Sequence, residues 1–204
     1  MKQLRYNKSS EEIKYLLDKD ASLDFLFSLK DEIVVNIDDN YFLSLAGIII
    51  AQQLSSKVAN VIFKRLENMF HQDVTAQKIL DAKDEDLRSI GLSHQKIKYL
   101  RSLAECHAQK IIDLSDLNHL SNQEIIDMLI KRKGIGVWSA QMFLMFSLGR
   151  EDVFSVLDLG LRNAVKKIYK NPDLTHDEIE KISENWVPYR SIVSYFLWHA
   201  WDTK

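Results

Sequence analysis

Residues that break helices are rare in this chain: its 204 residues include only six glycines and two prolines. A fold built from many short strands needs frequent turns, and glycine and proline supply many of them. Their scarcity therefore favours long helices. No segment shows sustained alternation of apolar and polar residues, and the closest to a strand, residues 31–37 (DEIVVNI), is not expected to form one. The sequence predicts an all-α fold.

Helix start signals recur along the chain. A capping box places serine or threonine three residues before glutamate, and three pairs match it: Ser9 with Glu12, Ser121 with Glu124, and Thr175 with Glu178. Further helices are expected to begin at other hydroxyl side chains: Ser55 or Ser56, Thr75 and Ser93. Pro188 suits the first turn of a last helix, where its missing N–H is harmless.

Composition narrows the class of protein. With 46% hydrophobic and 27% charged residues, the chain has the make-up of an ordinary globular protein. The single cysteine, Cys106, excludes an intrachain disulfide and a four-cysteine metal cluster. The longest apolar run, residues 42–51, is too short to span a bilayer, and the polar N-terminus has no signal-peptide pattern. Because the net charge is −2, any contact with nucleic acid must rest on a local patch.

Two closely spaced glycines, Gly134 and Gly136, lie between two apolar helical patterns in the segment GIGVWSA. Glycine permits backbone conformations that other residues avoid and allows close approach of another chain. Backbone amides of Gly134, Gly136 and Val137 at the start of a helix would suit an anion such as a phosphate. A plain tight turn between two helices is the alternative.

A second unusual feature is Asp158, which stands between apolar residues in the segment VLDLGLRNAV. Burying a carboxylate is costly unless other groups compensate for it. One interpretation is that Asp158 caps the helix that follows. The other is a chemical role, since the positive end of a helix dipole favours a negative charge at that position. Both can hold together.

These motifs, in this order, resemble the helix-hairpin-helix DNA glycosylase superfamily, and within it the alkylated-base group of 3-methyladenine DNA glycosylase II. The resemblance runs from about residue 40 to the end and rests on four segments: IIIAQQLSSKVA (48–59), the hairpin with VWSA (137–140), VLDLGLRNAV (156–165) and WVPYRSIVSYFLWHAW (186–201). Arg132 departs from the pattern, which commonly has an aliphatic residue there. The resemblance implies two helical lobes with a DNA-binding cleft between them, and no N-terminal β-domain. The expected lobes are residues 40–155, and residues 1–39 with 156–204.

The resemblance implies a catalytic role for Asp158, whose carboxylate would stabilise positive charge on the sugar as a base leaves. Relatives that also cut the strand carry a nucleophilic lysine where this chain has Trp138, so hydrolysis of the base without strand cleavage is predicted. The resemblance also implies a base pocket lined by Trp138, Trp198, Tyr195 and Gln52. The aromatic rings would hold a cationic alkylated purine through cation–π attraction. Core packing is the alternative for each aromatic.

The resemblance also implies a set of DNA contacts. The loop with Gln53, Leu54 and Ser55 would fill the gap left by an everted base, either Gln53 or Leu54 being the plug. The remaining expected contacts are in or near the hairpin and the last helix: Lys133, Gly134, Gly136, Val137, Ser139 and Arg190. For Arg190 the alternative is a surface ion pair. The basic run with His94, Lys96, Lys98 and Arg101 would contact the DNA backbone of the second strand, and a solvated face is the alternative.

The expected partner is double-stranded DNA that contains damaged bases, and the chain is expected to act as a monomer away from membranes. No catalytic metal or other cofactor is expected; a monovalent cation at the hairpin carbonyls is implied only by the resemblance. The expected location is the cytoplasm, at the nucleoid, in a bacterium and the nucleus in a eukaryote. Two other functions stay open: a glycosylase for another lesion, and a non-catalytic DNA-binding module, which would need no acid at Asp158.

Overall fold

The computed structural model describes residues 2–112, 114 and 117–202, and these form twelve helices and one two-stranded sheet. The chain divides into two compact units, which we name the terminal unit (residues 1–37 and 144–204) and the central unit (residues 38–143). The mainly helical prediction is confirmed. In the described part of the chain, no helix is both long and apolar enough to cross a membrane.

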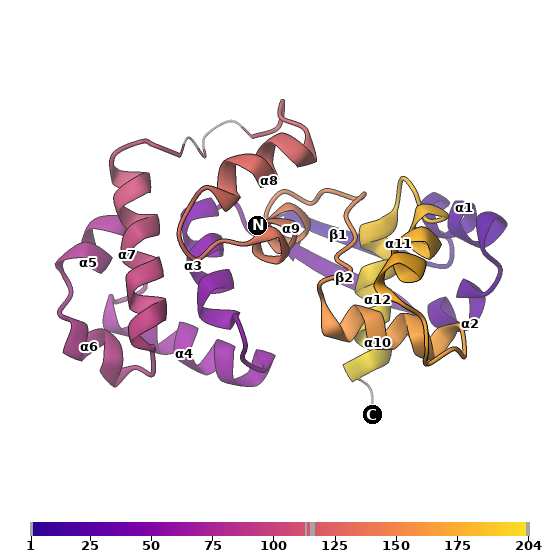
Figure 1. Ribbon diagram of the computed structural model, residues 1–204, viewed down its shortest axis with the longest axis horizontal. Helices are drawn as coiled ribbons and strands as arrows, with labels where there is room; N and C mark the ends of the chain where they lie inside the picture. The colour runs from indigo at the N-terminus through magenta and orange to yellow at the C-terminus, as the bar shows by residue number, and fades with distance from the viewer. Residues whose placement is uncertain (1, 113, 115–116, 203–204) are drawn as a thin grey trace. The chain divides into compact units, whose positions relative to one another are not determined.

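The terminal unit combines both ends of the chain (Figure 1). Its elements are β1 (Lys2–Asn7), α1 (Glu11–Lys19), α2 (Leu23–Ser28), β2 (Glu32–Ile37), α10 (Leu159–Ile168), α11 (His176–Glu184) and α12 (Arg190–Asp202). Helix α12 packs against α2 and α10, and Phe27 of α2 meets Phe196 of α12 edge to face at 4.9 Å. The largest fully buried side chain is Trp186, between α11 and α12.

The central unit is entirely helical in its described residues. Its elements are α3 (Tyr41–Ala51), α4 (Ser56–Met69), α5 (Ala76–Asp81), α6 (Asp84–Ser89), α7 (His94–Ala108), α8 (Asn122–Ile130) and most of α9 (Val137–Phe146). Figure 1 shows α7 between α3 and α5, and α7 packs against α3, α5 and α6. Its spacing of Ile97, Leu100, Leu103 and Ala104 gives one buried face, as a helical period requires.

Residues 31–37 were not expected to form a strand, and this expectation was wrong. Strand β2 pairs with β1 in antiparallel register from Lys2–Ile37 to Asn7–Glu32. In β2, Val35 and Ile37 are buried while Val34 and Asn36 are exposed, which is the alternation of a sheet with one covered face. The exposed position holds an apolar Val34, so the sequence hides this alternation. The partner strand also lies far away in the chain, and no hairpin turn signals the pair.

Two of the three predicted capping boxes are confirmed, at Ser121 and Thr175, and Ser55, Thr75 and Ser93 cap their helices as well. The box at Ser9 and Glu12 was wrong. Helix α1 begins one residue later, after Ser10, with no side-chain cap. Asn7 is the reason, since its side chain accepts the Ser9 hydroxyl and its backbone N–H donates to Ser10 Oγ at 3.0 Å.

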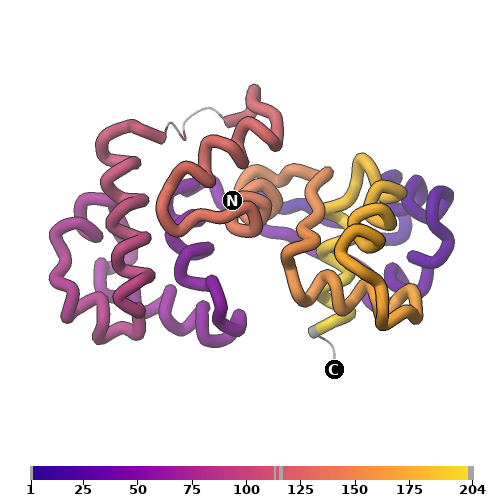
Figure 2. The backbone as a smooth tube through the Cα atoms, viewed as in Figure 1, coloured from indigo at the N-terminus to yellow at the C-terminus, as the bar shows by residue number. Residues whose placement is uncertain are grey.

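The boundary between the units lies at residues 143/144, within α9, and not at the 155/156 expected for the lobes. The segment after α9 is attached to the terminal unit (Figure 2). A methyl group at Gly149 would lie 3.4 Å from both Leu4 and Ile37, so this turn packs on the sheet. The N–H of Ser191 in α12 donates to the carbonyl of Glu151 at 2.8 Å. These contacts belong to residues far apart in the sequence.

Asp20, at the end of α1, links three parts of the terminal unit. Its carboxylate accepts hydrogen bonds from Ser22, from the Tyr169 hydroxyl and from Trp186 Nε1 at 3.3 Å. Burial opposes the charged form, but these hydrogen bonds outweigh it and hold the pKa of Asp20 below its usual value. Burial and the bond to Asp20 raise the pKa of Tyr169 to about 12.

The lowered pKa of Asp20 predicts a pH-dependent contribution to stability. An unfolded aspartate titrates near pH ~3.9, so the unfolded state binds the proton more readily than the folded state does. The contribution is therefore present above pH ~3.9 and is lost as the pH falls through the folded pKa. We expect Asp20→Asn to lower the melting temperature at pH 7, and the difference from wild type to narrow below about pH 4. A difference that stays constant across this range would contradict the assignment.

Candidate functional site

Asp158 is the N-cap of α10, which confirms the capping interpretation. Its Oδ1 accepts the backbone N–H of Leu161 at 2.9 Å and Nε1 of Trp198 at 3.1 Å. The side chain is half-buried. Two donors on one oxygen fix the orientation of the carboxylate at the start of a helix, where the helix dipole favours negative charge.

The turn before α10 is held from both sides. The N–H of Asp158 donates to Ser155 O at 3.0 Å, and Arg162 of α10 reaches back to Val156 O at 2.7 Å. Upstream, Ser191 of α12 accepts Val153 N–H at 3.0 Å and donates to Arg150 O at 2.7 Å. Trp198 belongs to α12, and the segment that leads to the acid is held to the same helix, which preserves the spacing of the two side chains.

Aromatic side chains of the terminal unit gather beside the acid. The ring of Phe146 lies 5.6 Å from Trp198 and 5.6 Å from Tyr195, and these two rings lie 6.4 Å apart. Tyr195 is only 6% exposed and its hydroxyl donates to Met145 O at 3.0 Å. Burial, with a smaller effect from Glu151, raises the pKa of Tyr195. Tyr195 thus backs the cluster as a core residue, whereas Phe146 is 37% exposed.

Phe146 and Gly160 were missed by the sequence reasoning. Phe146 ends an apolar helix, where nothing in the sequence separates an exposed ring from a buried one. Gly160 lies in the first turn of α10, and a Cβ there would lie 3.2 Å from Asp158 Oδ1 and 3.5 Å from Trp198 Cδ1. The absent side chain at Gly160 leaves room for the pairing of the acid with the indole.

Exposed apolar side chains flank the acid on both sides. Leu157 is 52% exposed and Leu159 is 62% exposed, so the apolar run that seemed to bury Asp158 lies largely at the surface. Exposed apolar side chains that cluster on a surface often mark a binding site. The surface around Asp158 therefore combines a fixed carboxylate, aromatic rings and apolar contacts.

In the central unit, the two hairpin glycines have different roles. Gly134 has a φ of +87°, and a Cβ there would lie 2.2 Å from Cγ of Tyr99, which is an impossible contact. Gly136 has nothing within 4 Å of its Cβ position. Gly134 is therefore required by the protein's own packing. Gly136 leaves open space at the start of α9, where backbone amides can receive an anion.

Gln52 lies against this hairpin. Its Nε2 donates to Gly134 O at 2.7 Å and to Ser139 Oγ at 2.9 Å. Ser139 is only 2% exposed and its hydroxyl holds Gln52, so the DNA contact predicted for Ser139 stays a prediction. The amide of Gln52 likewise is engaged within the protein.

The loop that follows Gln52 presents side chains outward. Gln53 has a φ of +57° and is exposed, and Leu54 is 38% exposed. Ser55 accepts Val58 N–H as the N-cap of α4. All three loop residues expected at DNA are therefore accessible, and Ser55 also fixes the start of the next helix.

The other predicted residues of the hairpin region are partly accessible. Lys133 is exposed, Val137 is 39% exposed, and Trp138 is half-buried in the first turn of α9. All three belong to the central unit, whereas Asp158 and Trp198 belong to the terminal unit. Lys133 lines a groove with Lys98 and Tyr99 of α7.

Arg190 and Arg101 are bound within the protein. Arg190 forms a two-pronged ion pair with Asp152, with Nε 2.6 Å from Oδ1 and Nη2 3.0 Å from Oδ2. The ion pair that was the alternative for Arg190 is therefore present, and the DNA contact of Arg190 stays a prediction. Arg101 donates to Leu80 O at 2.8 Å and to Ala82 O at 2.7 Å, which fixes the connection after α5.

The hairpin carbonyls fit a monovalent cation only in part. Gly134 O accepts Gln52 Nε2 at 2.7 Å, and Gly136 O accepts Ala140 N–H at 3.0 Å. A cation would have to share both oxygens with these donors. Across residues 2–112, 114 and 117–202, no three His, Cys, Asp or Glu side chains lie together as a metal site.

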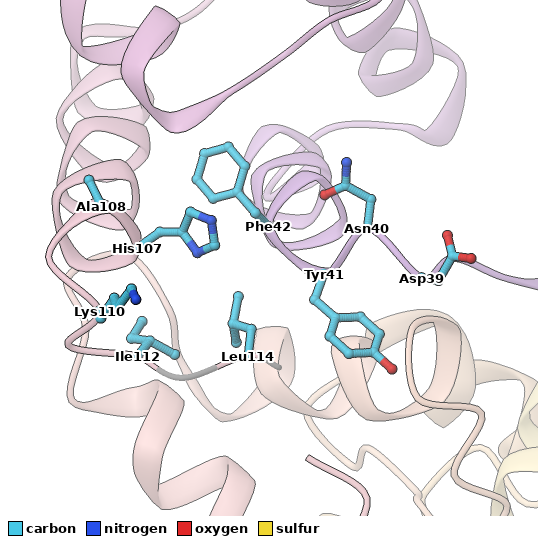
Figure 3. Close-up of a pocket in the computed structure, with 9 residues that line it drawn as sticks. All are labelled: Asp39, Asn40, Tyr41, Phe42, His107, Ala108, Lys110, Ile112 and Leu114. Carbon is cyan, nitrogen blue, oxygen red and sulfur yellow. The ribbon is translucent and has the colours of Figure 1, made fainter. Parts of the chain in front are cut away.

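A cavity of about 790 Å³ lies elsewhere in the central unit, between the start of α3 and the end of α7 (Figure 3). The ring of Phe42 stacks on His107 at 4.9 Å, and Tyr41 and Lys110 also line it. None of the predicted site residues is among the described residues that line this cavity. The candidate site therefore does not include it.

Comparison with known proteins agrees with this arrangement. Residues 46–189 match the family described as HhH-GPD superfamily base excision DNA repair protein. DNA-3-methyladenine glycosylase 1 of Schizosaccharomyces pombe is 38% identical over 152 residues, covering 72% of this chain and 67% of its own length. The DNA-3-methyladenine glycosylase of Saccharomyces cerevisiae is 32% identical, covering 94% of this chain and 79% of its own length.

Solved structures give the same result. A DNA-3-methyladenine glycosidase of Bacillus halodurans superposes with a TM-score of 0.84 and 33% identity, covering 98% of this chain and 93% of the other. The Schizosaccharomyces pombe enzyme Mag1, solved in complex with abasic DNA, gives a TM-score of 0.80 and 31% identity, with 96% of both chains covered. The family match spans more than half of the residues and includes the hairpin and Asp158. This chain belongs to the HhH-GPD superfamily of base excision DNA repair proteins.

Proposed function

We propose that this protein is a DNA glycosylase that hydrolyses alkylated purines of the 3-methyladenine type from double-stranded DNA and leaves the strand intact. The observation that carries the proposal is the fixed carboxylate of Asp158, held by Leu161 N–H and Trp198 beside an aromatic cluster. Relatives named DNA-3-methyladenine glycosylase, at 38% and 32% identity, support the choice of lesion.

The chemistry follows from the charge on the sugar. As the bond between C1′ and the base breaks, its electron pair leaves with the base, and the sugar becomes an oxocarbenium-like cation. The Asp158 carboxylate stabilises that cation. Water then adds to C1′ and loses a proton, which gives free base and an abasic site. An alkylated purine starts with a positive charge that the departing electron pair neutralises, so it needs little help from an acid.

Aromatic side chains suit such a leaving group. The face of an indole or phenyl ring attracts a cation with roughly 0.5–2 kcal/mol. Trp198 and Phe146 provide such faces next to Asp158. Trp138 stands where strand-cutting relatives are expected to carry a nucleophilic lysine. Its indole has no amine to attack C1′, so no covalent strand-cleaving intermediate forms there.

DNA binding is proposed to use the accessible residues of the central unit. The backbone amides at Gly136 and Val137 would receive one phosphate, with Lys133 nearby. Gln53 and Leu54 would enter the duplex and fill the space of the everted base, which offsets part of an unstacking cost of a few kcal/mol. The protein would act as a monomer, in the cytoplasm at the nucleoid of a bacterium or in the nucleus of a eukaryote.

A panel of duplexes tests the proposal, each with one lesion at the same position. We expect release of free base from the duplex with 3-methyladenine, and at least about 10-fold slower release from those with 8-oxoguanine or uracil. Free base is measured chromatographically under single-turnover conditions. Preferred release of an oxidised or deaminated base would assign the protein to another lesion. Binding without any base release would make it a DNA-binding module.

A further inference from the structure

Lys96 makes an unusual contact with the end of α3. From the first turn of α7 its ammonium group lies 2.6 Å from Ile50 O and 2.9 Å from Gln52 O. Partial burial lowers the pKa of Lys96. Two of its three protons are therefore engaged by backbone carbonyls of the same unit, so this lysine is poorly placed to bind a DNA phosphate.

The contact stabilises a helix end that otherwise has open acceptors. The last carbonyls of a helix have no partner within it, and they carry the negative end of the helix dipole. A positive charge at this end is favourable. Ile50 belongs to the last turn of α3, and Gln52 is its C-cap.

The same contact holds a turn of unfavourable backbone conformation. Gln53 follows directly and has a φ of +57°, a region that costs residues other than glycine roughly 1–2 kcal/mol. The turn is closed by Leu54 N–H, which donates to Ala51 O at 3.1 Å. Without the hydrogen bond from Lys96 to Gln52 O, fewer interactions offset this conformational cost, and the turn can adopt other backbone conformations.

Gln52 is also held from its other end. Its side-chain amide donates to Gly134 O and Ser139 Oγ, in the hairpin. The backbone of Gln52 is thus fixed by α7 and its side chain by the hairpin. This double attachment sets the position of Gln53 and Leu54 relative to the hairpin within one compact unit.

We propose that Lys96 is a positioning residue for base eversion, which holds the turn after α3 so that Gln53 and Leu54 enter the duplex in a single orientation. This inference rests on the function proposed above. It assigns Lys96 no contact with the base or the sugar. Its loss should therefore affect the step in which a stacked, paired base leaves the helix, and should spare the chemistry on a base that is already unpaired.

The test compares one lesion in two settings. Single-turnover release of 3-methyladenine is measured from a duplex in which the lesion is paired, and from the same duplex with the lesion in a one-nucleotide bulge. We expect Lys96→Met to slow release from the paired site about 10-fold or more, and from the bulge less than about 2-fold, because eversion costs a few kcal/mol only when the base is stacked and paired. Lys96→Arg, which keeps the charge and the donors, should restore most of the paired rate.

Lys78→Met provides the matched control, since Lys78 is a surface lysine of α5 in the same unit and forms an ion pair with Asp73. It should leave both rates unchanged. Equal slowing of both substrates by Lys96→Met, or no slowing of the paired one, would overturn the inference. If the wild-type protein releases base from neither substrate, the proposed function itself fails. If Lys96→Met does not fold, the ratio of release from the paired site to release from the bulge is measured for Lys96→Gln instead.

Discussion

Replacing Asp158 with asparagine is expected to slow base release about 100- to 1,000-fold, the usual effect of removing one preorganised electrostatic group from an active site. The substitution removes the negative charge and little else. Asparagine is as good an N-cap as aspartate, and its oxygen can still accept both Leu161 N–H and Trp198 Nε1. The fold and the position of the side chain should therefore persist.

Single-turnover release of 3-methyladenine measures this effect, and two controls accompany it. The melting temperature should stay within a few degrees of wild type, since a lost surface charge changes stability by about 0.5 kcal/mol or less. Affinity for a duplex that contains the lesion should be unchanged or slightly higher, because a negative charge near the phosphates has been removed. Base release at the wild-type rate would remove the catalytic role of Asp158 and leave only its role as a cap.

The second large effect is expected at Gly134. Replacement with alanine forces a left-handed backbone on a residue with a side chain, which costs roughly 1–2 kcal/mol. It also drives the new methyl group into the ring of Tyr99, where the Cβ would lie 2.2 Å from Cγ. Overpacking of this kind typically costs about 1–3 kcal/mol more. We expect Gly134→Ala to lose roughly 2–5 kcal/mol of stability, a fall in melting temperature of about 4–20 °C.

Gly136→Ala is the matched control two residues further on. Nothing lies within 4 Å of its Cβ position, so stability should change by less than about 1 kcal/mol. The methyl group would instead occupy the space through which a phosphate reaches the amides of α9, and affinity for DNA should fall. Thermal unfolding and a DNA titration measure the two effects. Equal stability loss in both variants would contradict the division of roles between the two glycines.

Much of this architecture could be predicted because local signals decide it. The caps at Ser121 and Thr175 follow from side chains three residues apart, and the cap at Asp158 follows from an aspartate directly before the helix. The start of α4 was predictable as well, because Ser55, one of the two serines expected there, caps this helix. In each case the residues that determine the structure are neighbours in the sequence.

The features that could not be predicted depend on contacts between distant residues. Arg190 pairs with Asp152, and Ser139 is buried against Gln52, which lies 87 positions earlier. Nothing near Arg190 or Ser139 in the sequence reveals these partners. Lys96 is similar, because its run of basic residues resembles a solvated face, yet its ammonium group reaches carbonyls of α3.

The proposed function depends on the release of a damaged base by hydrolysis alone. The most direct measurement incubates the wild-type protein with a duplex that carries one 3-methyladenine, and follows free base and strand length together, with and without borohydride. Hydrolysis without strand cleavage predicts free 3-methyladenine, a strand that breaks only after alkali, and no protein–DNA adduct. Strand breaks without alkali, or a borohydride-trapped adduct, would show amine chemistry and contradict it.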